Sequence, residues 1–177
     1  SKAESQMIRE KMRICQMAAS LIEPNDIIII DNGTTTEHLP KYMPQSLPLT
    51  IICFALNIFY GLYKNNNYKI IMTGGYFHHN TLMFESAEGV EFIKKVRANK
   101  AFITAAGVDD KLGVTCATTY EVNTKKAAIE NSDTKILLTD STKFGKIHVS
   151  YFADLKYFDI IITDSNIPDE YRKDIKN

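Results

Sequence analysis

The 177-residue sequence contains only three cysteines, and they lie far apart. Cys15, Cys53 and Cys116 have no paired metal spacing and are odd in number, so we expect reduced, packed thiols in a cytoplasmic protein. The four histidines also lack the spacing of metal ligands. The sequence therefore predicts neither a metal site nor a bound cofactor.

Long apolar runs, a charge excess and familiar catalytic motifs are missing as well. The longest apolar run, from Ile51 to Leu56, is far too short for a membrane span, and no signal peptide is evident, so we expect no membrane partner. Lysine and arginine number 21, and so do aspartate and glutamate, which argues against DNA binding by this chain's own surface. Neither a G-x-S-x-G nor a G-x-x-x-x-G-K-[ST] motif occurs, and we assign no catalytic residue.

The sequence does contain a regular alternation of short apolar runs and helix-like segments. The apolar runs predict strands at 27–30, 50–54, 69–72, 101–104, 135–138 and 160–163. Helix-like segments lie near 34–42, 56–64, 86–97, 119–131 and 168–175, whereas 75–84 and 143–158 are less regular. This alternation predicts one α/β domain, with a mostly parallel sheet and helices on both faces.

An amphipathic helix is expected at residues 4–22, before the first strand. Its apolar row contains Ile8, Met12, Cys15, Ala19 and Ile22. Glu10 belongs to the polar residues that we expect to face away. The helix either packs on the domain or projects from it, and its broad stripe predicts self-association into a homo-oligomer. We divide the single domain, residues 1–177, into this N-terminal segment (1–23) and an α/β core (24–177).

The loop after the first strand is the strongest candidate for a binding site, because ligands of open α/β sheets bind at the carboxyl ends of the strands. It reads Asp31-Asn32-Gly33-Thr34-Thr35-Thr36. Gly33 permits a tight turn close to an anion, and the threonines offer hydroxyl and N–H groups at a helix start. This composition predicts a phosphate cradle. The alternative is a threonine N-cap that follows a tight turn.

Two further loops carry weaker signals. Gly74 and Gly75 permit either the close approach of a ligand or only a sharp turn. Asp109, in a loop of small residues, offers a carboxylate to sugar hydroxyls or caps a turn. Local sequence leaves both pairs of interpretations open.

Two Lys-containing segments complete the set of candidates. Glu121 and Lys125 are four residues apart on an expected helix, and spacing alone favours a solvated surface pair. Lys143 can bring a cation to a phosphate, with Asp140 to orient it or bind a hydroxyl. The alternative for this second segment is a capping aspartate beside a solvated lysine.

The order and spacing of these motifs resemble the C-terminal effector-binding domain of the DeoR family of bacterial transcriptional repressors. The resemblance covers nearly the whole chain and includes segments 18–22, 31–36, 74–75, 101–103, 107–109, 113–115, 121–125, 140–145 and 162–164. It implies a Rossmann-like fold related to ribose-5-phosphate isomerase and the sugar-phosphate deaminases. It also implies that a sugar phosphate is the inducer, and that operator DNA is contacted only through an upstream winged helix, which is absent from this chain.

The resemblance places Thr34–Thr36 and Lys143 at the phosphate end of the effector. Asn57 is the residue retained from a family Thr-Asn-Ser segment, and Phe84-Glu85 stands where the family has a small glycine. Together with Asp31-Asn32-Gly33 and Phe77-His78, these departures resemble one member of the family most. That resemblance implies deoxyribose 5-phosphate as the effector. The expected effector site comprises Asp31, Gly33, Thr34, Thr35, Thr36, Asn57, Gly74, Gly75, Asp109, Glu121, Lys125, Asp140 and Lys143.

Two classes of function follow from these expectations. The leading hypothesis is a sensor domain without enzymatic activity that controls the DNA binding of an upstream winged helix-turn-helix. The alternative is a sugar-phosphate isomerase or deaminase on the same fold, for which Asp109, Glu121 or Asp140 would serve as general base. Turnover of a sugar phosphate, as opposed to saturable binding alone, distinguishes the two.

Overall fold

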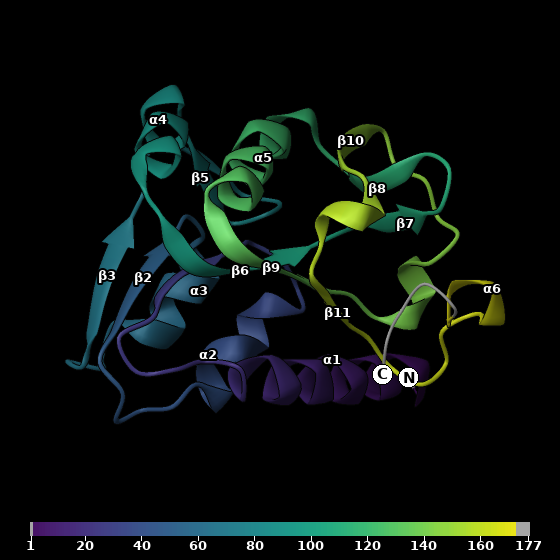
Figure 1. Cartoon of the computed structure of the whole chain (residues 1–177), viewed down its shortest axis with the longest axis horizontal. Helices are drawn as coiled ribbons and strands as arrows, with labels where there is room; N and C mark the ends of the chain where they lie inside the picture. The colour runs from purple at the N-terminus through teal and green to yellow at the C-terminus, as the bar shows by residue number, and fades with distance from the viewer. Residues whose placement is uncertain (1, 173–177) are drawn as a thin grey trace.

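Six parallel strands form the central sheet of the computed structural model, which describes residues 2–172 (Figure 1). Their order across the sheet is β11-β9-β6-β1-β2-β3. The strands are β1 (Ile27–Ile30), β2 (Leu49–Cys53), β3 (Tyr68–Met72), β6 (Ala98–Thr104), β9 (Ser132–Leu138) and β11 (Ile160–Ile162). Each of the six apolar runs thus forms one of these strands, which confirms the predicted parallel sheet.

Helices cover both faces of this sheet (Figure 1). One face carries α1 (Lys2–Ala19), α2 (Leu39–Tyr42) and α3 (Leu56–Leu62), and the other carries α4 (Ala87–Lys95) and α5 (Val122–Glu130). Side chains alternate along a strand, so Ile28 and Ile30 of β1 pack toward α1 while Ile29 packs toward α5. The short helix α6 (Asp169–Arg172) ends the described part, and residues 173–175 of the expected last helix lie outside it.

The first helix, α1, lies along the sheet with most of its apolar side covered. Ile14, Cys15 and Ala18 are buried there, whereas Ile8 is 49% exposed. Glu10, which we expected to face away, is buried, because it lies four residues before Ile14 on the same side of the helix. The chain's own sheet therefore covers most of the stripe that motivated self-association, which stays a prediction.

Two small antiparallel sheets flank the central one, where the sequence indicated only irregular segments. One is a hairpin of β4 (Tyr76–His78) and β5 (Met83–Glu85). The other joins β7 (Gly107–Asp109), β8 (Gly113–Cys116) and β10 (Ser150–Ala153). Strands of three or four residues are too short to produce a recognisable alternation of apolar and polar side chains.

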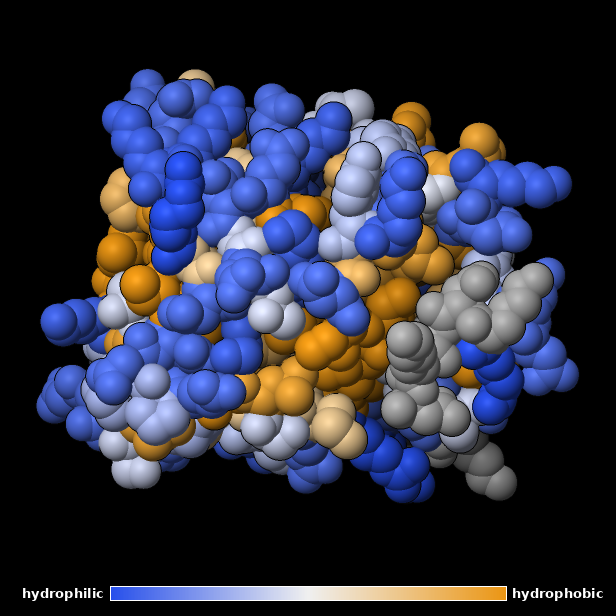
Figure 2. Space-filling model, viewed as in Figure 1, coloured by the Kyte–Doolittle hydropathy of each residue, from blue (hydrophilic) through white to orange (hydrophobic). Residues whose placement is uncertain are grey.

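The edge of the central sheet at β11 is less well covered than the faces of the sheet. Figure 2 shows hydrophobic surface between the two helix layers, in the region where Figure 1 draws the edge strand β11. Ile160 and Ile161 of this strand are half-buried. Within residues 2–172, no helix is long and apolar enough to cross a membrane, and no group of three potential metal-ligating side chains occurs.

Candidate functional site

A cleft of about 290 Å³ lies at the carboxyl ends of the central strands, where the sequence predicted a site. The loop after β1, the end of β6, the turn of the β4–β5 hairpin and α5 contribute to its wall. Among the predicted site residues, it brings together Gly33, Thr34, Thr35, Asn57, Glu121, Lys125 and Lys143. The topology explains this assembly, because parallel strands deliver their following loops to one edge of the sheet.

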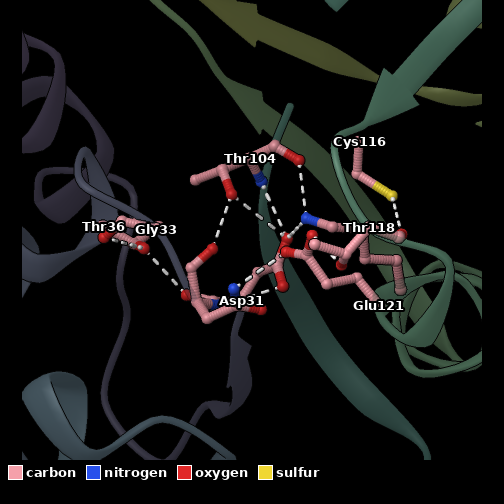
Figure 3. Close-up of polar contacts among 9 residues, drawn as sticks. Asp31, Gly33, Thr36, Thr104, Cys116, Thr118 and Glu121 are labelled. Carbon is pink, nitrogen blue, oxygen red and sulfur yellow. Dashed lines mark hydrogen bonds and ion pairs between the residues drawn. The ribbon is translucent and has the colours of Figure 1, made fainter. Parts of the chain in front are cut away.

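A buried ion pair between Lys125 and Asp31 lies at the base of this cleft. Lys125 is 2% exposed and Asp31 is fully buried. The ammonium of Lys125 contacts Asp31 Oδ2 and donates to the carbonyl oxygen of Thr104 at 2.9 Å. Figure 3 shows Asp31 and Thr104 facing each other, and the Thr104 N–H donates to Asp31 Oδ2 at 3.0 Å.

The surface pair predicted from the spacing of Glu121 and Lys125 was wrong. Lys125 instead pairs with Asp31 at the end of β1, 94 residues away in the sequence. Glu121 is also buried and faces the same cluster (Figure 3). A local spacing rule cannot anticipate a partner that only the sheet topology brings near.

Burial and neighbouring charges act in opposite directions on the two members of the pair. Burial raises the pKa of Asp31 above its ordinary value, and Lys125 and the Thr104 N–H offset this only in part. Burial lowers the pKa of Lys125, but the carboxylates of Asp31 and Glu121 more than offset it, so that the pKa lies above its ordinary value. Lys125 is therefore held in its charged form.

Glu121 is held in place by hydrogen bonds to both carboxylate oxygens. Asn32 Nδ2 donates to Glu121 Oε1 at 2.9 Å. The hydroxyl of Thr118 donates to Glu121 Oε2 at 2.6 Å. These bonds link the loop after β1 to the start of α5 across the base of the cleft.

The three threonines after β1 have three different environments. Thr36 is buried and its hydroxyl donates to the carbonyl oxygen of Asp31 at 2.8 Å. Thr34 is exposed, and its hydroxyl accepts a hydrogen bond from Lys11 Nζ of α1 at 2.9 Å. The carbonyl oxygen of Thr35 accepts one from Cys15 Sγ at 3.0 Å. Two of the three thus contact α1.

The segment after these threonines differs from the helix expected at 34–42. It is a 3-10 turn, η1 (Thr36–His38), followed by the single turn of α2. Such short elements have only a small dipole, so an anion here would depend on individual N–H groups and cations. The N–H groups of Thr34 and Thr35 donate to no acceptor within residues 2–172, and Thr35 makes no side-chain cap bond. The geometry therefore does not support the N-cap alternative.

Lys143 reaches the cleft from the 3-10 turn η3 (Ser141–Lys143) after β9. In the described part of the chain, its ammonium has no ion pair, in contrast to that of Lys125. Asp140 does not line the cleft, because its carboxylate caps η3 by accepting from the Thr142 N–H at 2.9 Å. In this segment, Asp140 is therefore a capping residue, as the alternative interpretation predicted. Lys143 lines the cleft, as the binding-site interpretation predicted.

Comparison with known proteins identifies the family. The sequence matches the family model described as the DeoR C-terminal sensor domain over residues 6–165. The chain belongs to the DeoR family. It is 32% identical to the deoxyribose operon repressor of Escherichia coli K12, a match that covers 98% of this chain and 69% of that protein. It is also 32% identical to the lactose phosphotransferase system repressor of Staphylococcus epidermidis, over 92% of this chain and 64% of that protein.

Solved structures resemble this DeoR-family chain in fold. The eIF2B beta subunit of Chaetomium thermophilum has a TM-score of 0.62 at 16% identity, over 87% of this chain and 50% of that one. Ribose 5-phosphate isomerase A of Neisseria gonorrhoeae has a TM-score of 0.52 at 12% identity, over 76% and 52%. The chain spans about half the length of these structures, and the likeness concerns the fold alone. The expected relation to the ribose-5-phosphate isomerase fold is confirmed.

The structure places three other predicted site residues of the DeoR-family chain away from the cleft. Gly74 and Gly75 lie beside the β4–β5 hairpin. Gly75 has φ +138°, and a Cβ there would lie 2.2 Å from the carbonyl oxygen of Glu85, so the close approach of the chain to the end of β5 requires a glycine. Asp109 caps the β7–β8 turn by accepting from the N–H groups of Lys111 and Leu112, at 3.0 and 2.7 Å.

Sequence reasoning missed several residues at the DeoR-family cleft. Asn32 lines it and Lys11 contacts Thr34 beside it. Asn32 lies between two residues that we singled out, so its position alone could have signalled it. Lys11 gave no such signal, because it belongs to the helix face that we expected to be solvated. The hairpin turn at 80–82 also lines the cleft, and only the structure reveals it.

Proposed function

We propose that this domain senses a phosphorylated sugar, and in particular deoxyribose 5-phosphate, through the strand-end cleft. The observation that carries this proposal is that, among the described residues, the ammonium of Lys143 has no ion pair and the N–H groups of Thr34 and Thr35 have no acceptor, and all three residues line the same cleft. Cationic and N–H donors together suit a phosphate group. The remaining polar lining, which includes Asn57 and Glu121, suits sugar hydroxyls.

The choice of deoxyribose 5-phosphate is supported by the relative at 32% identity that is named the deoxyribose operon repressor. We further propose that the full-length protein is a repressor. In this proposal, the effector controls DNA binding by an upstream winged helix-turn-helix, and the domain forms a homo-oligomer. The named relatives of the chain are transcriptional regulators, which supports this placement.

Binding without turnover fits the cleft better than catalysis. An isomerase or deaminase needs a free general base beside its substrate. Asp109 and Asp140 cap turns outside the cleft, and both oxygens of Glu121 already accept hydrogen bonds. These three carboxylates were the candidates for the enzymatic alternative, so their placement supports a sensor.

Deoxyribose 5-phosphate is expected to stabilise the domain far more than free deoxyribose does. A ligand that binds only the folded state stabilises it by about 2.7 kcal/mol at a hundredfold excess over Kd, which raises Tm by about 5–10 °C for a domain of this size. A thermal melt with each sugar measures the difference. Equal shifts from both sugars would contradict a phosphate site.

Lys143→Ala is expected to weaken the binding of deoxyribose 5-phosphate about 10- to 100-fold. The change removes one charge-assisted hydrogen bond to the phosphate, a contribution of roughly 1.5–3 kcal/mol. Titration calorimetry measures the affinity. Lys146→Ala is the matched control, because this exposed lysine is three residues further on and does not line the cleft. Equal affinity in the two variants would show that Lys143 does not bind the phosphate.

A further inference from the structure

Two residues that line the cleft each have a buried hydrogen-bond acceptor without a partner among the described residues. Among the described residues, the buried side-chain atoms that lack a partner are Asn32 Oδ1, Asn57 Oδ1, Ser150 Oγ and Thr163 Oγ1. Asn32 and Asn57 both line the strand-end cleft. Buried polar groups are normally hydrogen-bonded, because leaving one unpaired forfeits its hydration without replacement. Two such acceptors on residues that line a single cleft indicate a ligand that supplies donors.

Neighbouring carboxylates fix which atom of each amide is left unpaired. Asn32 Nδ2 donates to Glu121 Oε1 at 2.9 Å, and Asn57 Nδ2 donates to Glu37 Oε2 at 3.1 Å. An ionised carboxylate only accepts, so each amide must turn its NH2 group toward the carboxylate. The carbonyl oxygens are therefore the groups left without a partner, and a flipped amide would place two acceptors against each other.

Asn32 is the better fixed of the two. It is 3% exposed, whereas Asn57 is only half-buried and its partner Glu37 is exposed. The partner of Asn32, Glu121, is itself held by the hydroxyl of Thr118 at 2.6 Å. A carbonyl oxygen held this firmly selects for a donor at one position.

We propose that Asn32 is a specificity-determining residue whose Oδ1 accepts a hydrogen bond from a sugar hydroxyl, with Asn57 Oδ1 as a second acceptor. This inference rests on the proposed function and extends it to the orientation of the ligand. Phosphate oxygens are acceptors and are repelled by a carbonyl oxygen, so the phosphate lies toward Lys143. The hydroxyl-bearing carbons lie toward Asn32. The ligand class is then a phosphorylated sugar with at least two free hydroxyls.

The test compares ligands that differ by one hydroxyl, in the wild type and in Asn32→Ala. The ligands are deoxyribose 5-phosphate, 1,2-dideoxyribose 5-phosphate, which lacks the anomeric hydroxyl, and 2,3-dideoxyribose 5-phosphate, which lacks the 3-hydroxyl. Calorimetry gives the three affinities. We expect the wild type to bind one deoxy analogue about tenfold more weakly than the parent, or worse, because the acceptor then stays unpaired.

In Asn32→Ala, the affinities for deoxyribose 5-phosphate and for that weaker analogue are expected to lie within about twofold of each other, because the acceptor is gone. The exposed Asn66→Ala is the control and should discriminate as the wild type does. Equal weakening of all three ligands in Asn32→Ala would overturn the inference, because it would indicate a purely structural role or a bound water in place of the hydroxyl.

The wild-type affinities also distinguish failure of the proposed function from failure of the proposed role of Asn32. If Asn32→Ala fails to fold, the wild-type series still decides, because equal affinities for all three ligands overturn the role of Asn32. If the folded wild type binds none of the three, the proposed function and this inference both fail. If it binds all three equally, only this inference fails.

Discussion

Replacing Lys125 by methionine is expected to lower the free energy of unfolding by about 3–5 kcal/mol. Lys125 and Asp31 are buried together, and removing one partner of such a pair leaves an uncompensated charge in the interior. Methionine retains most of the apolar stem, so the loss reports the charge rather than a cavity. Urea unfolding near pH 7 measures it.

Lys126→Met is the matched control for this prediction. Lys126 is the next residue on α5 but is exposed, and surface substitutions usually change stability by under about 0.5 kcal/mol. A loss in Lys125→Met no larger than in Lys126→Met would contradict the buried ion pair.

The deficit of Lys125→Met is expected to shrink as the pH falls. Burial already raises the pKa of Asp31, and Lys125 opposes that rise, so its removal raises the pKa further. The folded variant then takes up a proton at a higher pH than the unfolded chain, whose aspartate titrates near about 4. Protonation removes the unpaired charge, so the variant recovers stability relative to the wild type as the pH is lowered from 8 toward 5. A deficit that grows toward pH 5 would contradict this assignment.

Phe102→Ala is expected to cost about 3–5 kcal/mol of unfolding free energy as well. Phe102 is fully buried in β6, in the core cluster that includes α1 and β1. Its deletion leaves a cavity that the close-packed sheet cannot fill. The variant retains the carbonyl oxygen of residue 102, which accepts from the Asp31 N–H at 2.9 Å, so a shift of β6 toward the cavity would be passed on to the end of β1.

The same deletion on the surface is the control. Phe92→Ala on α4 removes a side chain that is 39% exposed, so it forfeits less buried area and leaves no enclosed cavity. Denaturant unfolding of both variants should therefore rank Phe102→Ala as clearly the less stable. If both lost the same free energy, the packing of α1 on the sheet would need revision.

The sequence predicts the central sheet well because its strands are buried on both faces. Four consecutive isoleucines at 27–30 carry that signal without any tertiary information. The small sheets have no such signal, because strands such as β7, with three residues, owe their pairing to neighbours brought in from elsewhere in the chain. The 3-10 turn at Thr36–His38 was likewise invisible in a segment that looked helical.

The sequence predicts the location of the candidate site but not its hydrogen bonds and ion pairs. The rule that ligands bind at the carboxyl ends of strands correctly gathered Gly33 and Lys143 at one cleft, whereas only the family resemblance placed Glu121 there. It could not tell that Asp109 and Asp140 use their carboxylates locally, because a turn cap and a ligand contact require the same residue type. Nor could it supply partners as remote in sequence as Asp31 and Lys125.

The contacts between α1 and the threonine loop have a thermodynamic consequence. Lys11 donates to the hydroxyl of Thr34, and Cys15 donates to the carbonyl oxygen of Thr35, so the helix and the loop share one set of hydrogen bonds. A ligand that binds this loop more tightly in one arrangement of α1 shifts the helix toward that arrangement. By linkage, a partner that fixes the helix there raises the ligand's affinity by the same factor. The helix that leads into the first strand is thus placed to couple whatever binds it to occupancy of the cleft.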